Sequence, residues 1–264
     1  MKFGLRYCNT GPYVQPERAV ELAQAAESVG FESLWTVEHT VVPAGYKSPY
    51  PYSDSGKMAG GIDDFPIPDP LIWLTFVAGV TSSIKLATGI LILPQHNPVL
   101  VAKQVATIDC LSRGRAILGV GAGWLKEEFE ALGVSFSERG ERTDEYIQAL
   151  RALWSQEAST FDGRFTNFKS VYCRPLPKQK NIPIIIGGHS KAAAKRAGHL
   201  ADGYFPARSV PLDLINVAKQ SALDMGRDPD DLEITAGVPD NLDELQRYKD
   251  LGVKRVLLPV TTVT

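Results

Sequence analysis

His39 is the residue best placed in this sequence for acid–base chemistry. It follows a short apolar run, Ser33–Val37, that is typical of a β-strand, and Glu38 stands directly before it. A free imidazole titrates near neutral pH, so His39 could donate or accept a proton, and Glu38 could orient or charge its ring. The alternatives are a buried histidine whose hydrogen bonds the core satisfies and an exposed loop histidine.

Glycines gather at two other predicted strands. Gly89 interrupts a β-branched run at Lys85–Leu93, where a glycine indicates either a bulge that a ligand can approach or a plain strand residue. The run Gly119–Trp124 reads Gly-Val-Gly-Ala-Gly-Trp, which lets a flat ligand lie close to the backbone. It is not the dinucleotide fingerprint, because Trp124 stands where that motif has its third glycine.

An anion site is indicated where Gly187–Ser190 (Gly-Gly-His-Ser) leads into a predicted helix. The free N–H groups and the dipole of a helix N-terminus suit a phosphate, and Lys191 and Lys195 add positive charge. Arg208, after the next strand, is another candidate anion contact. The alternative is an ordinary turn between strand and helix with Ser190 as its cap.

Other chemistry has little support in the residues. The histidines lack the spacing of a metal site, so we expect no metal, and there is no Gly-x-Ser-x-Gly nucleophile motif. Three scattered cysteines are too few for a disulfide framework and fit a reducing cytosol. A helix predicted to begin at Asn97-Pro98 would turn Leu111 and Cys110 inward, which argues against a nucleophilic thiol at Cys110.

The elements that must position these residues alternate along the chain. Eight strands are predicted, at Lys2–Tyr7, Ser33–Val37, Lys85–Leu93, Arg115–Val120, Ile182–Ile186, Asp202–Phe205, Leu232–Ala236 and Lys254–Pro259. Seven of them are followed by a helical pattern, which predicts parallel strands joined by right-handed crossovers. We therefore predict an α/β fold, a closed (β/α)8 TIM barrel in a single domain over residues 1–264, with a doubly wound open sheet as the alternative.

Three features depart from this alternation. Glu38–Pro68 is a long connection after the second strand, with Tyr46, Tyr50 and Tyr52, and we predict a functional lid at the C-terminal face rather than a surface excursion without a role. A hairpin is expected at Ser159–Arg174. The last helix is expected to be reduced or missing, so that neighbouring elements or a partner subunit would cover that wall.

Composition excludes several classes of protein. The chain has 264 residues, 44% of them hydrophobic, and a formal net charge of −2, as in a packed globular protein without a basic surface for nucleic acid. No apolar window is long enough to span a membrane, and the first residues do not form a signal peptide. We expect a cytoplasmic protein that contacts neither nucleic acid nor membrane.

Taken together, the motifs resemble the bacterial luciferase-like monooxygenase superfamily, and most closely the branch that uses the deazaflavin coenzyme F420. The most specific stretch is Gly119–Gly133, continued by Glu138–Arg142. Also typical of the family, in this order and at these spacings, are Ala106–Gly114 before that stretch and Pro183–Gly188 and Ala201–Phe205 after it. The resemblance covers nearly the whole chain.

The resemblance implies a luciferase-like barrel with a flavin-like ring at the C-terminal mouth. A non-prolyl cis peptide, here Gly89–Ile90, would support the ring. Residues implied to bind the cofactor are Gly89, Ile90, Gly121, Ala122, Gly123, Gly187, Gly188 and Ser190, the last three near its phosphate-bearing tail. His39 matches a histidine that aids hydride transfer, and Glu38 takes the place of its acidic neighbour.

The resemblance also implies a function. Hydride transfer between F420 and a small organic substrate is expected, and the alternative is a monooxygenase that uses reduced FMN and oxygen, fed by a separate flavin or F420 reductase. A third hypothesis is a barrel that binds such a ligand without turnover. Trp124 replaces a glutamate of the sugar-phosphate dehydrogenases, so Trp124 and Tyr46 predict an aromatic site for a less polar substrate. The family is usually dimeric, so we expect a homodimer.

Overall fold

Eight parallel strands form a closed barrel in the computed structural model, which describes residues 1–58, 61–155, 157–206 and 210–260. In order around the barrel they are β1 (Lys2–Arg6), β2 (Ser33–Thr36), β3 (Lys85–Thr88), β5 (Ala116–Gly121), β8 (Ile184–Gly187), β9 (Gly203–Phe205), β10 (Glu233–Gly237) and β11 (Val253–Pro259). Pairing of β3 with β5 and of β1 with β11 closes the ring. The predicted (β/α)8 barrel is confirmed, and the open sheet is excluded.

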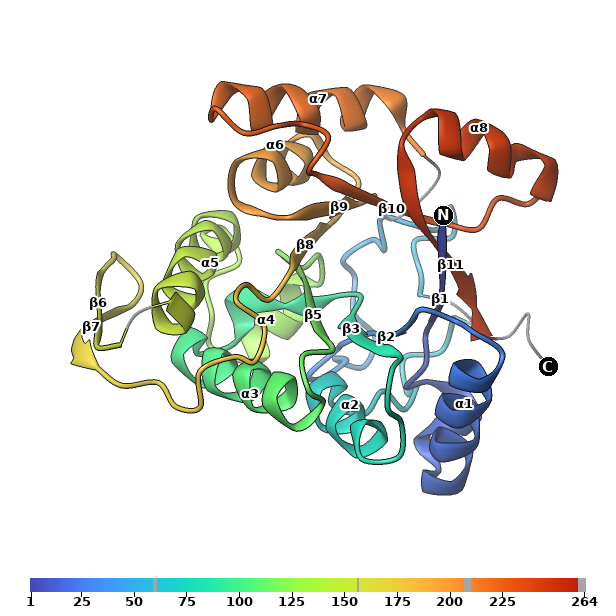
Figure 1. The fold of residues 1–264 in the computed structure, drawn as a ribbon, viewed down its shortest axis with the longest axis horizontal. Coiled ribbons are helices and arrows are strands. Elements are labelled where there is room, and N and C mark those ends of the chain that lie inside the picture. Colours follow the sequence, from blue (N-terminus) through green and yellow to red (C-terminus); the bar gives the residue numbers. More distant parts are fainter. Residues whose placement is uncertain (59–60, 156, 207–209, 261–264) are drawn as a thin grey trace.

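Helices surround these strands (Figure 1). They are α1 (Pro16–Ser28), α2 (Pro70–Ala78), α3 (Pro98–Leu111), α4 (Lys126–Ala131), α5 (Arg139–Ser155), α6 (Lys191–Leu200), α7 (Leu212–Asp224) and α8 (Leu245–Asp250), with short 3-10 turns at Gly11–Val14, Leu93–Gln95 and Leu242–Glu244. The predicted hairpin is present as β6 (Ser159–Asp162) and β7 (Asn167–Val171), which project beside α5. Because the described residues end at Val260, the expectation about a last helix lies outside them.

The helices that follow the functional segments begin at defined caps. The Asp69 carboxylate accepts hydrogen bonds from two backbone N–H groups in the first turn of α2, and the Asn97 side chain does the same for α3. Each helix then has proline at its first position, where no N–H partner is needed. The caps fix where the long loop ends and where the chain turns back after β4 (Leu91–Ile92).

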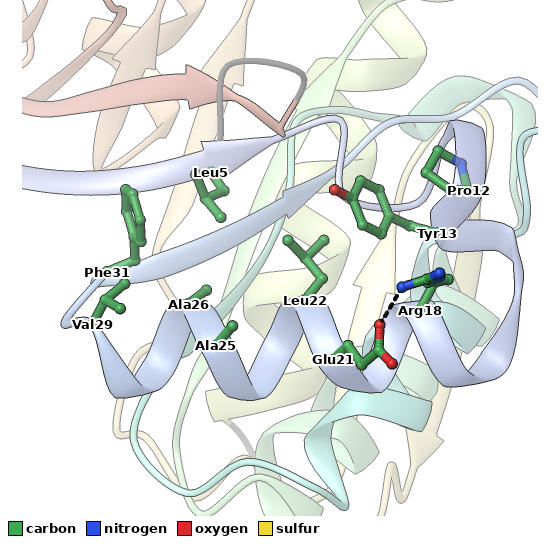
Figure 2. Close-up of a pocket in the computed structure, with 10 residues that line it drawn as sticks. All are labelled: Leu5, Pro12, Tyr13, Arg18, Glu21, Leu22, Ala25, Ala26, Val29 and Phe31. Atoms are coloured by element: carbon green, nitrogen blue, oxygen red, sulfur yellow. Dashed lines mark hydrogen bonds and ion pairs between the residues drawn. The ribbon is translucent and has the colours of Figure 1, made fainter. Parts of the chain in front are cut away.

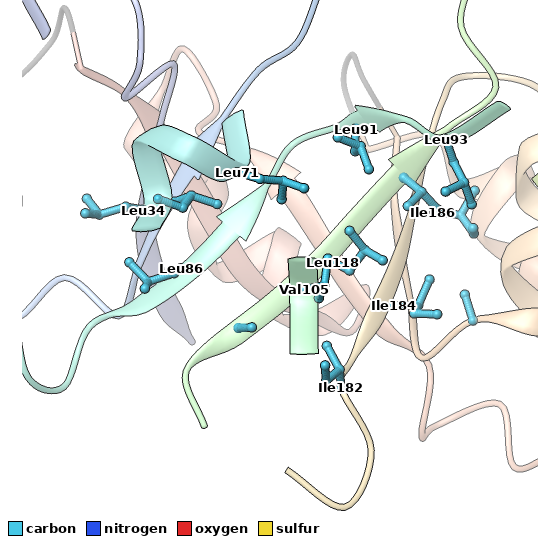
Figure 3. Close-up of a cluster of buried hydrophobic side chains, with 14 of the residues drawn as sticks. Leu34, Leu71, Leu86, Leu91, Leu93, Val105, Leu118, Ile182, Ile184 and Ile186 are labelled. Atoms are coloured by element: carbon cyan, nitrogen blue, oxygen red, sulfur yellow. The ribbon is translucent and has the colours of Figure 1, made fainter. Parts of the chain in front are cut away.

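Two apolar layers hold the barrel together. The outer layer lies between the strands and the helices, and Figure 3 shows Leu34, Leu86, Leu118 and Ile184 of four neighbouring strands within it. The inner layer fills the barrel itself and consists of Trp35, Ala87, Ile117, Ile185, Phe205 and Leu257. Because the interior is packed, a ligand must bind at the ends of the strands.

The prediction that Leu111 and Cys110 turn inward is wrong. Leu111 is exposed, and Cys110 is half-buried with its thiol 3.0 Å from the Leu176 carbonyl oxygen. At about 100° per residue, neither position continues the inward stripe that includes Val105. Ser112 does, and it is buried.

An apolar groove of about 470 Å³ lies on the outside of the barrel between α1 and β1 (Figure 2). Leu5, Leu22, Val29 and Phe31 are among the residues that line it, and an ion pair between Arg18 and Glu21, 2.8 Å long, borders it. The groove is on the outer wall, whereas the residues with candidate chemistry lie at the mouth.

Candidate active site

The cis peptide bond at Gly89–Ile90 is present, and it interrupts the predicted single strand between β3 and β4. It presents the Ile90 side chain across the mouth, over two glycines. A Cβ on Gly121 would lie 2.8 Å from Ile90 Cδ1, and one on Gly187 would lie 2.4 Å from Ile90 Cγ2. Only glycine therefore lets Ile90 lie there. We call Ile90, Gly121 and Gly187 the glycine shelf, and its partly exposed apolar top can support a flat ring.

A sharp turn after β5 places the next functional residues. Gly123 has a φ of +82°, and a Cβ there would lie 2.8 Å from both Ile92 and Phe129. A side chain is therefore excluded by conformation and by space. Ala122 and Trp124 flank this glycine, so the turn delivers the tryptophan to the mouth and starts α4 directly behind it.

His39 is held by a buried glutamate of α4. Its Nδ1 lies 2.9 Å from Oε2 of Glu128, whose Oε1 accepts the backbone N–H groups of Thr40 and Val41. Because a carboxylate only accepts hydrogen bonds, Nδ1 is the donor, and Nε2 is the atom left for other chemistry. The arrangement is a histidine–carboxylate pair that can move a proton at Nε2.

The expectation that Glu38 orients His39 is not met. Glu38 is buried and points away, since successive side chains of an extended segment face opposite sides. It accepts the backbone N–H of Ile92 at 2.5 Å and a hydrogen bond from His96 Nε2 at 2.8 Å. Glu38 thereby fixes β4 just after the cis bond.

A second histidine–carboxylate pair results from this contact. Burial alone lowers the pKa of His96, but the hydrogen bond to Glu38 and the negative charges of Glu38, Asp69 and Glu128 outweigh burial and raise it. His96 therefore favours its charged form at a higher pH than a free imidazole does.

Three aromatic side chains cluster next to His39. The Trp124 ring lies edge-on to His39 at 5.8 Å, and the rings of Tyr46 and Tyr50 contact Trp124 at 5.6 and 5.1 Å. Burial is the main cause of a raised Tyr50 pKa, so this phenol stays neutral. The predicted aromatic residues of the loop are thus brought together with Trp124 next to His39.

The long loop is tied to α4 by hydrogen bonds. Oε1 of Glu127 accepts the backbone N–H groups of Lys47 at 2.8 Å and Ser48 at 3.0 Å. A cleft of about 450 Å³ lies between two parts of this loop, lined by His39 and, among others, Val41, Asp63 and Phe65. The loop has the position that a lid requires.

At the end of β8 the structure shows an ordinary helix cap. The Ser190 hydroxyl accepts a backbone N–H from the first turn of α6. Gly188, with a φ of +138°, donates its N–H to Phe205, and its carbonyl accepts the Tyr204 hydroxyl at 2.8 Å. Phosphate binding at this helix start stays a prediction, and Arg208 lies outside the described residues.

Sequence reasoning missed Glu128 and His96 as members of the site. The signal for Glu128 was its place in an acidic pair, Glu127-Glu128, just after the glycine-rich turn at the carboxyl end of a strand. For His96 the sequence held no signal, because its partner is distant in the chain. In the described part of the chain, no group of three or more acidic, histidine or cysteine side chains could hold a metal ion, and no helix is long and apolar enough to cross a membrane.

The barrel, its glycine shelf and the histidine–carboxylate pair define a (β/α)8-barrel enzyme that works at the carboxyl ends of its strands. The chain belongs to the luciferase-like monooxygenase family, whose model matches residues 3–244. This family consists of oxidoreductases, and the match confirms the resemblance read from the motifs.

Individual relatives carry both cofactor types in their names. An uncharacterized protein of Mycobacterium tuberculosis, Rv0953c, is 33% identical over 97% of this chain and 91% of its own. The F420-dependent glucose-6-phosphate dehydrogenase of Kineococcus radiotolerans is 32% identical over 84% of this chain and 61% of its own. The FMNH2-dependent dimethylsulfone monooxygenase of Pseudomonas fluorescens is 34% identical over 70% and 46%.

Solved structures share the fold. An F420-dependent secondary alcohol dehydrogenase in complex with an F420-acetone adduct superposes with a TM-score of 0.76 at 19% identity, covering 98% of this chain and 92% of that one. At this identity the likeness establishes the barrel and leaves substrate and cofactor to the residues of the site.

Proposed function

We propose that this protein is an F420-dependent oxidoreductase that moves a hydride between the cofactor and a small organic substrate. The observation that carries the proposal is His39, held by Glu128 through Nδ1, at the same end of the barrel as a shelf that can support a flat ring. The relative in Kineococcus named for F420 supports the choice of cofactor.

The residues at the mouth fit a deazaflavin. A side chain at Gly121 or Gly187 would displace Ile90, so the shelf keeps a flat apolar surface at the depth a ring needs. Ala122 and Gly123 would line the same pocket, and Gly188 with Ser190 would lie toward the phosphate-bearing tail. Bound F420 would supply a hydride acceptor or donor at its C5 atom.

The side chains around the shelf would then handle the proton and the solvent. Nε2 of His39 would take a proton from a substrate hydroxyl during oxidation and return it during reduction. Glu128 keeps that atom free by holding Nδ1. Trp124 and Tyr46 would exclude water and contact the carbon skeleton of the substrate. The Kineococcus relative is named for a sugar phosphate, but Trp124 disfavours such a substrate in this chain.

A second function has support of its own. The Pseudomonas relative named for FMNH2 supports a monooxygenase that uses reduced FMN and oxygen. The same shelf would hold the isoalloxazine ring, and a separate flavin reductase would supply it. Binding without turnover is the remaining hypothesis, and it predicts that His39→Ala changes nothing measurable.

A paired titration tests the proposal. Purified protein is titrated with F420 and with FMN, each oxidised and reduced, and fluorescence is followed. We expect tight binding of F420 and weak binding of FMN. Preference for reduced FMN would support the monooxygenase instead. If the protein binds neither cofactor, both proposed functions are wrong.

A steric variant checks that the ring lies on the shelf. Gly187→Ala puts a methyl group into Ile90 and should weaken F420 binding at least about tenfold. Gly79→Ala is the matched control, since Gly79 caps α2 with an ordinary φ of −73° and has room for a Cβ. Equal binding by the two variants would show that the ring lies elsewhere.

The other expectations remain part of the proposal. We propose that the protein acts on small molecules in the cytoplasm, as a homodimer, with no role for nucleic acid or membrane. A separate F420 or flavin reductase would return the cofactor to the required redox state.

A further inference from the structure

Arg6, the last residue of β1, points into the mouth of the barrel. Gly4, two residues earlier on the same face of the strand, lies against Leu257 of the inner layer, since a Cβ there would be 2.9 Å from Leu257 Cδ2. Side chains two apart on a strand share a face, so Arg6 also faces inward. Its guanidinium nitrogens lie 3.4–3.5 Å from where a Cβ on Gly237 would be, at the carboxyl end of β10.

The charge of Arg6 has no anion beside it. Among the described residues no carboxylate pairs with it and no acceptor meets its guanidinium, and its Nε is buried without a hydrogen bond. Its one ring contact is with Tyr7, 5.0 Å away. Arg255, at the opposite end of the barrel, has both Glu32 and Glu233 as partners. A partly buried cation without a partner is costly unless a ligand supplies the anion.

The position of Arg6 is opposite the glycine shelf. Around the barrel β1 is four strands from β8 in either direction, so Arg6 and Gly187 face each other across the mouth. The charge of Arg6 also acts on the lid, where it opposes the burial that raises the Tyr50 pKa. Lys57, a further cation of the loop, is already engaged with the Tyr46 ring and Asp63. Among the residues that the structure describes, Arg6 is thus the cation left to a substrate between shelf and lid.

We infer that Arg6 binds the carboxylate of the substrate, so that the substrate is a small hydroxy acid or the corresponding oxo acid. A guanidinium binds a planar carboxylate through two parallel hydrogen bonds. A phosphate is usually held by several donors, and in the described part of the chain we identify only Arg6 as a cation facing this space without a partner. The Tyr7 ring contacts the Arg6 guanidinium, and the Tyr50 ring contacts Trp124, so aromatic neighbours that suit a carbon skeleton are present.

The chemistry rests on the proposed function and deepens it. The carbinol carbon of the hydroxy acid would lose a hydride, for which bound F420 would supply the acceptor, and its hydroxyl would lose a proton to Nε2 of His39. The carbonyl of the oxo acid would form as hydride and proton leave, and reduction of the oxo acid would reverse both transfers. Arg6 would hold the carboxylate throughout and take no part in either transfer.

Binding of acid and amide pairs tests the inference. Propanoate, lactate and benzoate are compared with propanamide, lactamide and benzamide by calorimetry, on the protein alone and with F420. We expect each acid to bind at least about tenfold more tightly than its amide. Arg6→Gln should abolish that preference with a loss of about 10- to 100-fold in acid affinity, and Arg6→Lys should recover part of it.

Controls separate this inference from the proposed cofactor. Arg18→Gln, on the outer wall, should bind acids as the wild type does. Arg6→Gln should keep its F420 affinity and its thermal midpoint, because the guanidinium makes no hydrogen bond to the described fold. Undiminished acid binding by Arg6→Gln, equal binding of acid and amide, or a preference for inorganic phosphate would each overturn the inference. If F420 does not bind the wild type, the proposed cofactor is wrong. The comparison of acids with amides on the protein without cofactor would still test the role of Arg6.

Discussion

Two histidine–glutamate pairs lie close together at the mouth, and their surroundings assign them different tasks. His39 donates from Nδ1 to a fully buried glutamate, which leaves Nε2 for other chemistry, and its ring lies edge-on to Trp124. His96 uses Nε2 to bond Glu38, and its raised pKa favours the charged form. His96 therefore balances the buried charge of Glu38, and His39 remains the group suited to moving a proton.

Replacing Glu128 with glutamine tests the role of His39 at this scale. The amide of Glu128→Gln can still accept from Thr40, but its NH2 group would face Nδ1 and favour the wrong tautomer of His39. We expect kcat to fall by about 10²- to 10⁴-fold, the range for a disturbed acid–base residue, while F420 affinity stays within about twofold. Steady-state kinetics and fluorescence titration measure the two quantities. Glu130→Gln, on the exposed face of the same helix, should leave both unchanged, and an unaltered kcat in Glu128→Gln would remove the pair from the mechanism.

The sequence allowed His39 to be predicted but not its partner. The position of His39 at a strand end is local information. Glu128 is 89 residues further on, and Glu38 reaches His96 across 58 residues. Such pairings depend on how barrel strands converge, so Glu38, the nearest carboxylate in the chain, was the natural and incorrect choice. Arg6 was not singled out either, because an arginine at the end of a strand usually finds a carboxylate.

At the scale of elements, α4 joins the lid to the catalytic histidine. Adjacent glutamates do this, since Glu128 holds the start of the loop and Glu127 holds Lys47 and Ser48 further along it. The Ser48 hydroxyl and the two backbone N–H groups, against a smaller effect of burial, lower the pKa of Glu127 to about 2. The acceptor is therefore ionised at any working pH.

Loss of this anchor should loosen the lid without disturbing the barrel. In Glu127→Ala the amides of Lys47 and Ser48 lose their acceptor, so we expect faster hydrogen exchange in the loop and a KM for substrate raised about 3- to 30-fold. The thermal midpoint should change little, because Glu127 is not part of the core. Glu130→Ala is the control on the same helix. Unchanged exchange at residues 47–48 would mean that other contacts hold the loop.

Another glutamate, Glu27, links α1 to the start of β3, and its contacts predict that stability depends on pH. Glu27 accepts the backbone N–H groups of Ser82, Ser83 and Ile84. Burial raises its pKa, but these hydrogen bonds outweigh burial and lower it from 4.5 to about 2. A lowered pKa stabilises the fold above about pH 4.5, and this contribution is lost as the pH falls toward 2.

Glu27→Gln should accordingly be less stable than the wild type at pH 7 by about 1–2 kcal/mol, a figure reduced for solvent screening. The difference should shrink steadily below pH 4.5. Urea unfolding at pH 7, 5, 4 and 3 measures it. Glu21→Gln, on the exposed side of α1, should show no such difference, and a gap that persists at pH 3 would mean that the carboxylate charge is not responsible.

The elements themselves were largely predictable. Seven of the eight barrel strands fall where alternation of apolar runs and helices placed them, because burial on both faces makes parallel strands continuous apolar runs. The exception is Lys85–Leu93, which the structure divides into β3 and β4. Periodicity shows only apolar character, and the break depends on how Ile90 fits over glycines of two other strands.

At the scale of the whole molecule, the expected homodimer needs an apolar surface, and we compare two that the described residues form. One is the groove between α1 and β1, with Val29 73% exposed at its edge. The other spans α2 and α3, where Ile72 is 70%, Phe76 47% and Leu100 62% exposed. Ile72 and Phe76 are one helical turn apart and Leu100 is on the neighbouring helix, so the second surface offers exposed apolar side chains from two adjacent helices to a second copy.

We therefore expect the dimer to form through α2 and α3, and Phe76→Glu to convert it to a monomer. A stable dimer buries roughly 800 Å² per chain, and a charge at the centre of such an apolar face cannot be paired by symmetry, because the partner presents the same charge. Sedimentation at micromolar concentration measures the state. Val29→Glu should stay dimeric, and the reverse result would move the interface to the outer groove. Since the glycine shelf, His39 and Glu128 all come from one chain, the Phe76→Glu monomer should still bind F420, whereas loss of binding would show that association completes the site.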